Sequence, residues 1–473
     1  MPARSSSFKA AAAAYTQKRD TRAFLRGSMT GYLAARAQRE TEFQDWQAAR
    51  EAASAAKAEA VDNLDRYLPE FVEKIEARGA KVFFARNGDR ARDYIRGVIQ
   101  AHDAKCIVKS KSMTGEEIHL TETLEHEGYE VVESDLGEYI VQLRGEHPFH
   151  IVAPAMHLRR EEIRELFADK LGPGAGTSDD PTALTMDARR AIRQKYLEAD
   201  IGISGVNFAV AETGQMVICT NEGNGRLSTS LPKVHIAIMG IEKVLPTLDD
   251  LALLLPMLAT AGTGQHITGY TTMIGGPRQP GETDGPEEFH LVIMDNGRST
   301  LLADAEQRDA LHCIRCGACI YMCPIFKNVG GHTYDTTYMG PIGSVITPHL
   351  RGLQEWKHLP SSSSLCGACT ETCPVHIDLH HHLLHNRRNA AAAQPAWWER
   401  LAFRGYRTLA ARPGLFAMAG KAGRLFQKLA SPLLGSSIDP AKAWTRCRTL
   451  PNPPERSFRE WWAERNGTAN GRK

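Results

Sequence analysis

Seven cysteines in two short runs are the residues whose type and spacing point most directly to chemistry in this chain. The first run has the pattern C-x2-C-x2-C-x3-C-P and consists of Cys313, Cys316, Cys319 and Cys323, followed by Pro324. This spacing is typical of bacterial iron–sulfur ligands, in which the fourth cysteine commonly binds the other cluster of a pair. The run therefore predicts an iron–sulfur centre, which requires a reducing compartment.

A second run repeats the pattern with one thiolate fewer. It consists of Cys366, Cys369 and Cys373 before Pro374, and Ser363 stands where the first run has its leading cysteine. Structural zinc also uses C-x2-C pairs, but a triplet followed by a second C-P run favours iron–sulfur clusters. A disulfide framework fits less well, because the chain is long and shows no secretory signal.

An exchange of the last cysteine between the runs assigns ligands to two [4Fe–4S] clusters. One cluster has four thiolates, namely Cys313, Cys316, Cys319 and Cys373. The other has three, namely Cys323, Cys366 and Cys369. Its last position could take Ser363, Cys447, a neighbouring histidine or water, or could stay empty in a [3Fe–4S] cluster. No Ser-His-Asp or paired-carboxylate signature identifies catalytic residues.

Composition limits the remaining possibilities. The chain has 473 residues, 42% apolar and 24% charged, which suits two to four domains. A net charge of +2 and a pI near 8.0 predict no nucleic-acid partner. We expect no transmembrane segment, because the most apolar window, residues 248–261, contains two aspartates and a proline and is too short. We expect a cytoplasmic protein; the alternative is the faint resemblance of the Arg/Ser/Ala-rich start to a mitochondrial presequence.

The rest of the chain divides into three further segments around the cysteine runs. Residues 1–78 are rich in strong helix formers and predict an N-terminal helical segment. From residue 79 to 304, short apolar runs alternate with amphipathic helices, which predicts a parallel, doubly wound α/β domain. Its first expected strands are residues 81–85, 105–109, 129–133 and 150–153. Four further apolar runs have little helix between them and could pair antiparallel: residues 201–204, 208–211, 216–219 and 234–238. Residues 289–294 form a final expected strand.

The last two segments carry the cysteines and a basic tail. Residues 305–389 form the predicted cluster domain, beginning with a helix over 305–312. Residues 390–473 form a basic helical extension with many aromatic side chains. Such a surface could pack on this chain or a partner, or make peripheral contact with an anionic membrane.

Three loops of the α/β segment are candidates for ligand binding, because they follow strands. Residues 110–117, with Lys109 and Lys111, could hold an anion at a helix start. The alternative is an ordinary capping box of Thr114 with Glu117. The glycine-rich turns at 212–214 and 220–226 could bind a ligand or merely bracket a strand.

With these motifs in place, the chain resembles the lactate utilization protein B family, the iron–sulfur subunit of bacterial lactate utilisation. The likeness covers nearly the whole length, including the three loops, both cysteine runs and a Pro-Pro-x-x-Ser-Phe-Arg tail. It implies an α/β domain similar to sugar-phosphate isomerases and CoA transferases, and an α-helical ferredoxin-like domain with two [4Fe–4S] clusters on the cysteines named above. It also implies a role, with two other lactate-utilisation subunits, in oxidising L-lactate to pyruvate.

We therefore predict an electron-transfer subunit that passes single electrons between its clusters. One alternative is an electron-carrying subunit of another 2-hydroxy-acid or glycerol-3-phosphate dehydrogenase. The other is a metabolite-binding α/β enzyme with accessory clusters. As a further hypothesis, a hydroxy acid could bind the open iron of the three-thiolate cluster, with iron as Lewis acid.

Overall fold

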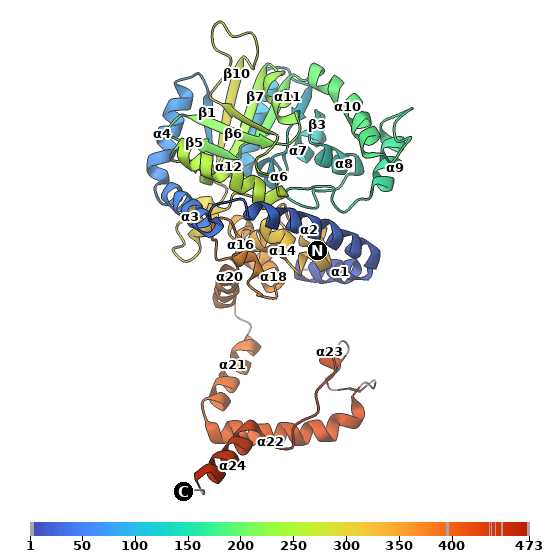
Figure 1. Cartoon of the computed structure of the whole chain (residues 1–473), viewed down its shortest axis with the longest axis vertical. Helices are drawn as coiled ribbons and strands as arrows, with labels where there is room; N and C mark the ends of the chain where they lie inside the picture. Colours follow the sequence, from blue (N-terminus) through green and yellow to red (C-terminus); the bar gives the residue numbers. More distant parts are fainter. Residues whose placement is uncertain are drawn as a thin grey trace. The chain divides into compact units, whose positions relative to one another are not determined.

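The computed structural model describes residues 4–393, 397–434, 436, 438–439, 441–445 and 448–470 (Figure 1). The chain divides into two compact units, with the boundary after Ala390. Cys447, one of the candidates for the open position of the three-thiolate cluster, lies outside the described residues.

The N-terminal segment is helical, as its composition predicts. It forms α1 (Arg4–Gln17), α2 (Arg19–Glu40), α3 (Trp46–Asp62) and α4 (Leu64–Glu76). Leu64, Phe71 and Ile75 of α4 are buried, so its apolar stripe faces the core. In contrast, α2 contacts α14 (Ala318–Met322), the helix that carries Cys319 (Figure 1). The first helices therefore cover both the α/β domain and the cysteine-bearing region.

A six-stranded parallel sheet forms the centre of the α/β domain, which confirms the predicted fold class. Its order is β1-β10-β7-β4-β2-β3. The strands are β1 (Lys81–Ala85), β2 (Cys106–Lys109), β3 (Glu130–Glu133), β4 (Ile201–Gly205), β7 (Val234–Gly240) and β10 (Glu288–Met294). The order changes direction at β2, whose neighbours are β3 on one side and β4 on the other. Parallel sheets bind ligands at such a switch point, beyond the carboxyl ends of the strands.

The sheet is buried on both faces, as parallel sheets require. In β7, Ile236 and Ile238 pack toward α5 (Gly88–Ala101), whereas Ala237 and Met239 pack toward α4 and a second sheet. The other helices of this domain are α6 (Met113–Glu117), α7 (Leu120–His126), α8 (Leu136–Arg144), α9 (Arg160–Lys170), α10 (Pro181–Glu198), α11 (Asn224–Ser230), η1 (Ile241–Lys243), α12 (Leu248–Thr263) and α13 (Arg298–Leu302).

The second sheet corrects part of the predicted strand pattern. It has the order β8-β5-β6-β9 and consists of β5 (Phe208–Val210), β6 (Gln215–Thr220), β8 (Val244–Leu245) and β9 (Tyr270–Ile274). Of the four runs between 201 and 238, only β5 and β6 pair antiparallel; the other two are β4 and β7 of the parallel sheet. The sequence did not predict β8 and β9.

The predicted strand at residues 150–153 is wrong, because a side chain closes a turn there. The Nδ1 atom of His150 accepts hydrogen bonds from the N–H groups of Val152 (3.1 Å) and Ala153 (3.2 Å). These bonds leave the backbone no ladder partner. Ile151 is buried in the same core cluster as Cys316 and Cys319, so its apolar character reflects contact with the cysteine region.

The cysteine region is built from short helices joined by turns. They are η2 (Arg308–His312), α14 (Ala318–Met322), α15 (Phe326–Val329), η3 (His332–Tyr334), α16 (Gly340–Arg351), α17 (Leu353–Trp356), α18 (His358–Ser361), α19 (Ala368–Glu371) and α20 (Leu379–Ala393). The helix expected over 305–312 is only the 3-10 turn η2. The two runs repeat one geometry, because Gly317 and Gly367 both adopt a positive φ (78° and 82°) just before a short helix.

The second unit consists of helices with exposed apolar side chains. It contains α21 (Trp397–Ala410), α22 (Pro413–Ala430), η4 (Ser431–Leu433), α23 (Lys442–Thr445) and α24 (Phe458–Asn470). Within α21, Leu401 is 65% exposed and Phe403 is 71% exposed. Across both units, none of the described helices has the length and apolar character needed to cross a membrane.

Candidate iron–sulfur centre and adjoining cleft

Four of the seven cysteines line one small cavity: Cys313, Cys316, Cys319 and Cys373. The other lining residues are mainly aliphatic, and include Ile151 from the α/β domain. Gly317 permits this packing, because a Cβ atom there would lie 2.9 Å from Cγ2 of Val152. The cavity thus places four thiols from two separate peptides in an apolar, enclosed setting that fits a thiolate-ligated cluster.

Backbone N–H groups point at these sulfurs. The N–H of Arg315 donates to Cys313 Sγ at 3.4 Å, and that of Ile377 donates to Cys373 Sγ at 3.4 Å. The N–H of Phe326 donates to Cys323 Sγ at 3.5 Å. Such donors stabilise anionic sulfur and raise the reduction potential of a bound cluster.

Cys323, Cys366 and Cys369 form a second group, next to the first. Cys319 lies on α14 and Cys323 follows it directly, so one helical turn joins the two groups. Cys366 is exposed, whereas Cys369 is buried. Burial, and next the charge of Cys323, raise the pKa of Tyr334. The exposed sulfur leaves one side of this group open to solvent.

The buried thiols need a cation in order to ionise at neutral pH. Burial, and next the charge of Cys313, raise the pKa of Cys316 to about 12. Burial, and next the charge of Cys323, raise the pKa of Cys369 to about 12. A bound metal centre supplies the positive charge that deprotonates a coordinating thiol. Both groups therefore fit metal-bound thiolates better than free thiols.

The spacing of the sulfurs is wider than zinc requires. Around one zinc ion with Zn–S bonds of about 2.3 Å, tetrahedral sulfurs lie about 3.8 Å apart. Within the described parts of the chain, no group of three potential ligand atoms lying within 4.8 Å of one another includes a cysteine. The geometry thus favours a larger inorganic core. The ligand assignment to each cluster stays a prediction, as does the hydroxy acid at an open iron.

Ser363 is engaged in local hydrogen bonds. Its Oγ atom accepts a hydrogen bond from the N–H of Leu365 at 3.1 Å, and its carbonyl accepts one from Arg387 at 3.0 Å. These contacts give Ser363 a role in shaping the turn before Cys366, beside its candidacy as a ligand.

Buried cations surround the four-thiol cavity, and the sequence did not predict them. Lys57 is 2% exposed and donates to the Glu242 carbonyl at 2.7 Å. Burial and nearby Lys243 lower the pKa of Lys57 to about 7. Arg50 donates to the Cys373 carbonyl at 2.8 and 3.0 Å. These cations offset negative charge on a cluster, which is one of the controls on its potential.

A chain of buried ion pairs connects the α/β domain to this cavity. Arg298 donates to Glu117 at 2.7 and 2.9 Å and to Glu242 at 2.7 Å. Arg315, between two predicted ligands, donates to Glu242 at 3.3 Å. Tyr338 donates to Glu117 at 2.7 Å. The network spans η1, α6, α13 and the first cysteine run.

The network corrects the capping-box alternative for residues 110–117. The N-cap of α6 is Ser112, whose Oγ accepts from the Gly115 N–H at 3.0 Å, while Glu117 is committed to Arg298. Lys109 is also unavailable as an anion ligand. It is fully buried and pairs with Glu133 at 2.7 Å and Glu116 at 3.0 Å.

A cleft of about 330 Å³ lies between the α/β domain and the first cysteine run. Loops that follow β2, β3, β4 and β7 line it, together with Arg315 and Cys316. Two of the three predicted loops reach the cleft, namely residues 110–114 and 220–224. The third, 212–214, does not: it is the hairpin turn between β5 and β6, and Gly214 packs on Lys74 of α4.

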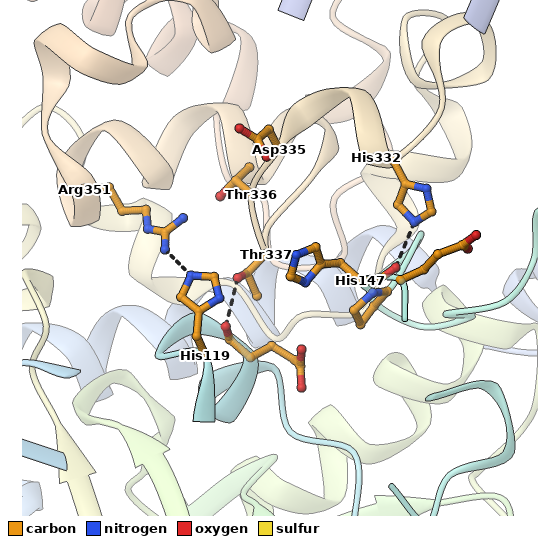
Figure 2. A pocket seen from close by; sticks show the side chains of 11 residues that line it. His119, His147, His332, Asp335, Thr336, Thr337 and Arg351 are labelled. Carbon is orange, nitrogen blue, oxygen red and sulfur yellow. Dashed lines mark hydrogen bonds between the residues drawn. The ribbon is translucent and has the colours of Figure 1, made fainter. Parts of the chain in front are cut away.

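A separate cavity contains a histidine group that the sequence did not predict. Figure 2 shows His119, His147 and His332 around it, with Arg351 beside His119. The polar groups contact one another: Arg351 donates to His119 at 2.6 Å, and His332 Nε2 donates to the His147 carbonyl at 2.8 Å. These residues are far apart in the sequence, so no local pattern could have identified them.

Comparisons with known proteins agree with this architecture. Residues 68–294 match the LUD domain family, residues 309–377 match the 4Fe-4S dicluster domain family, and residues 380–467 match the family described as Lactate utilisation protein B, C-terminal. A solved DUF162 family protein from Deinococcus radiodurans covers 49% of this chain and 98% of its own, at 14% identity and a TM-score of 0.28. That similarity is too low to support an argument.

Curated relatives match over nearly the full length. Lactate utilization protein B of Bacillus velezensis is 44% identical over 451 residues, covering 93% of this chain and 94% of that protein. The Bacillus subtilis protein of that name is 44% identical with the same coverage. The Shouchella clausii protein is 45% identical over 430 residues, covering 90% of each chain. The resemblance in the motifs is thus confirmed, and this chain belongs to the lactate utilization protein B family, as an iron–sulfur component of lactate utilisation.

Proposed function

We propose that this chain is the electron-transfer subunit of a multi-subunit system that oxidises L-lactate to pyruvate. The observation that carries the proposal is the arrangement of seven cysteines into a group of four and a group of three, joined through α14. We assign a [4Fe–4S] cluster to each group, with the second cluster held by three thiolates. Thiolate-ligated clusters also support a cytoplasmic location.

The stoichiometry of the reaction suits two one-electron centres. Oxidation of lactate to pyruvate releases two electrons and two protons. Two clusters could accept both electrons before passing them singly to an acceptor outside this chain. The exposed Cys366 supports an exit through the three-thiolate group, since the four-thiol cavity lies deeper in the core.

Anaerobic purification tests the cofactor assignment. We expect a brown protein with about eight iron and eight sulfide per chain, or about seven iron if the second cluster is [3Fe–4S]. Iron and sulfide assays with EPR before and after reduction measure this. A colourless preparation containing zinc would contradict the proposal.

The substrate is tested with the assembled system. Lactate, glycolate and glycerol 3-phosphate are each added to the oxidised complex of this chain with its partner subunits. We expect cluster reduction with L-lactate alone. Reduction by glycolate or glycerol 3-phosphate instead would identify the subunit with another dehydrogenase.

The second unit supports a role in assembly with two other lactate-utilisation subunits. Leu401 and Phe403 are exposed on α21, among Arg400, Arg404 and Arg407. Exposed aromatic residues flanked by arginine are typical of binding surfaces. We assign this surface to a partner subunit, and peripheral membrane contact is the competing occupant.

A double substitution tests the surface. We expect Leu401→Asp with Phe403→Asp to weaken co-purification with the partner subunits at least about tenfold, because apolar anchors dominate interface energies. Thr408→Asp on the same helix is the matched control and should bind normally. Iron content should be unchanged in both. If the double variant keeps its partners but no longer binds phosphatidylserine vesicles, the surface contacts a membrane instead.

A further inference from the structure

We propose that the cleft between the α/β domain and the first cysteine run binds a small 2-hydroxy or 2-oxo carboxylate, beside the predicted cluster ligand Cys316. This inference rests on the proposed function and adds a location to it. It places substrate or product recognition on this chain. It also moves the expected site from the open position of the three-thiolate group to the side of the four-thiol cavity.

The position of the cleft is the first argument. It lies beyond the carboxyl ends of β2 and β4, where the strand order changes direction. The loops that follow β2 and β4 are in contact there: a Cβ atom added to Gly205 would lie 3.0 Å from Ser112 Oγ. Doubly wound sheets bind ligands in this crevice. Its volume of about 330 Å³ suits a small ligand with some ordered water.

Buried polar groups without partners are the second argument. Ser110 is 2% exposed and its Oγ has no hydrogen-bond partner. Asn224 is 5% exposed, and neither its Oδ1 nor its Nδ2 has a partner. The Nη1 group of Arg315 is likewise buried and unpartnered. All three side chains line the cleft. Buried polar groups in native proteins are normally satisfied, so a set of this kind indicates a bound polar molecule.

The charged side chains of the cleft favour an anionic ligand, which is the third argument. Lys111, Lys243 and Arg315 line the cleft; Arg315 donates to Glu242 through Nη2, and its Nη1 group remains available to a ligand. Guanidinium and ammonium groups are the usual donors to a carboxylate. Asn224 and Ser110 can both donate to and accept from a hydroxyl group, and can donate to a keto oxygen. The acidic residues Asp135 and Glu222 limit the total negative charge that the cleft can accept.

The histidine cavity of Figure 2 provides a contrast. Its polar groups contact one another: Arg351 donates to His119 at 2.6 Å, and the Thr337 hydroxyl donates to the backbone carbonyl of Glu116 at 3.1 Å. A ligand there would have to replace existing contacts. In the cleft, Ser110, Asn224 and Arg315 offer groups that a ligand can satisfy at no such cost.

The test measures binding to the anaerobically purified full-length chain. Isothermal titration calorimetry is performed with L-lactate, pyruvate, glycolate and inorganic phosphate. We expect the 2-hydroxy and 2-oxo acids to bind, and Asn224→Leu and Lys243→Met each to weaken that binding by about tenfold or more. Lys81→Met, which removes only a surface ion pair with Glu288, is the control and should bind normally.

Spectroscopy on the same samples locates the ligand. Added pyruvate should shift the EPR signal that depends on Cys316, and leave the signal that depends on Cys369 unchanged. A shift confined to the Cys369-dependent signal would overturn the proposal in favour of the open position. So would phosphate binding without carboxylate binding, or normal affinity in both cleft variants.

Iron and sulfide content separates this inference from the proposed function. If the variants retain both clusters and bind carboxylate like the wild type, the cleft is not the site, but the electron-transfer role stands. If the chain holds no cluster yet binds pyruvate through Asn224, the electron-transfer role fails while the cleft assignment survives.

Discussion

Replacing Cys373 with alanine is expected to abolish the four-thiolate cluster, although this residue belongs to the second cysteine run. Cys373 lines the same cavity as the first three cysteines of the first run. Losing one of four thiolates from an enclosed apolar site leaves iron without a replacement ligand. We expect about half of the iron and sulfide to be lost, and the corresponding EPR signal to disappear.

The reciprocal variant makes the test specific. Cys323→Ala should remove the three-thiolate cluster and leave the four-thiolate signal intact, although Cys323 belongs to the first run. Cys106→Ala is the matched control, because Cys106 is buried in β2, away from both groups. If Cys373→Ala and Cys316→Ala affected different clusters, the exchange of ligands between runs would be wrong.

The substitution Arg298→Met is expected to destabilise the chain by about 3–5 kcal/mol, the range for breaking a buried ion pair. Arg298 is 1% exposed and bridges Glu117 and Glu242, so its loss leaves two buried carboxylates without the cation that they share. Urea denaturation followed by circular dichroism measures the change. Arg388→Met, which breaks an exposed ion pair with Glu306, is the control and should leave the free energy of unfolding nearly unchanged.

The pH dependence of the unfolding free energy shows whether the destabilisation by Arg298→Met comes from lost charge interactions. Burial alone would raise the pKa of Glu242, but Arg298 and then Arg315 outweigh it and lower that pKa to about 2. For Glu117, Arg298 together with hydrogen bonds from Asn296 and Tyr338 outweighs burial and lowers the pKa. Because both folded pKa values lie below 4.5, the stabilisation is complete above pH 4.5 and is lost as the pH falls toward 2.

In Arg298→Met the carboxylates of Glu117 and Glu242 can protonate more easily. The loss of stability relative to wild type should therefore become smaller as the pH is lowered from 7 toward 4. A deficit that does not change with pH would assign the effect to lost packing of the arginine stem rather than to charge.

The sequence predicted those features that depend on local spacing. The seven cysteines and the alternation of β2, β3 and β10 with helices could be predicted from short stretches of sequence. The family resemblance added an architecture that the comparisons confirm.

The features that the sequence did not predict depend on distant contacts. Residues 150–153 look like a strand because Ile151 and Val152 are apolar, yet they pack against the cysteine loop. The partners of Arg298 lie 56 and 181 positions away. That the side chains of Ser110 and Asn224 lack hydrogen-bond partners can be seen only in the folded structure, where two loops come together. The sequence does not show whether a polar side chain finds a partner.

One hydrophobic core unites Leu25 and Met29 of α2 and Ala53 of α3 with Cys316, Cys319 and Cys373. During biosynthesis α2 and α3 leave the ribosome some 260 residues before the first of these cysteines, so their final packing surface does not yet exist. Both helices also contact α12, so they can pack on the α/β domain first, and only the part of their surface that faces the cysteines is completed late, once the second cysteine run is made.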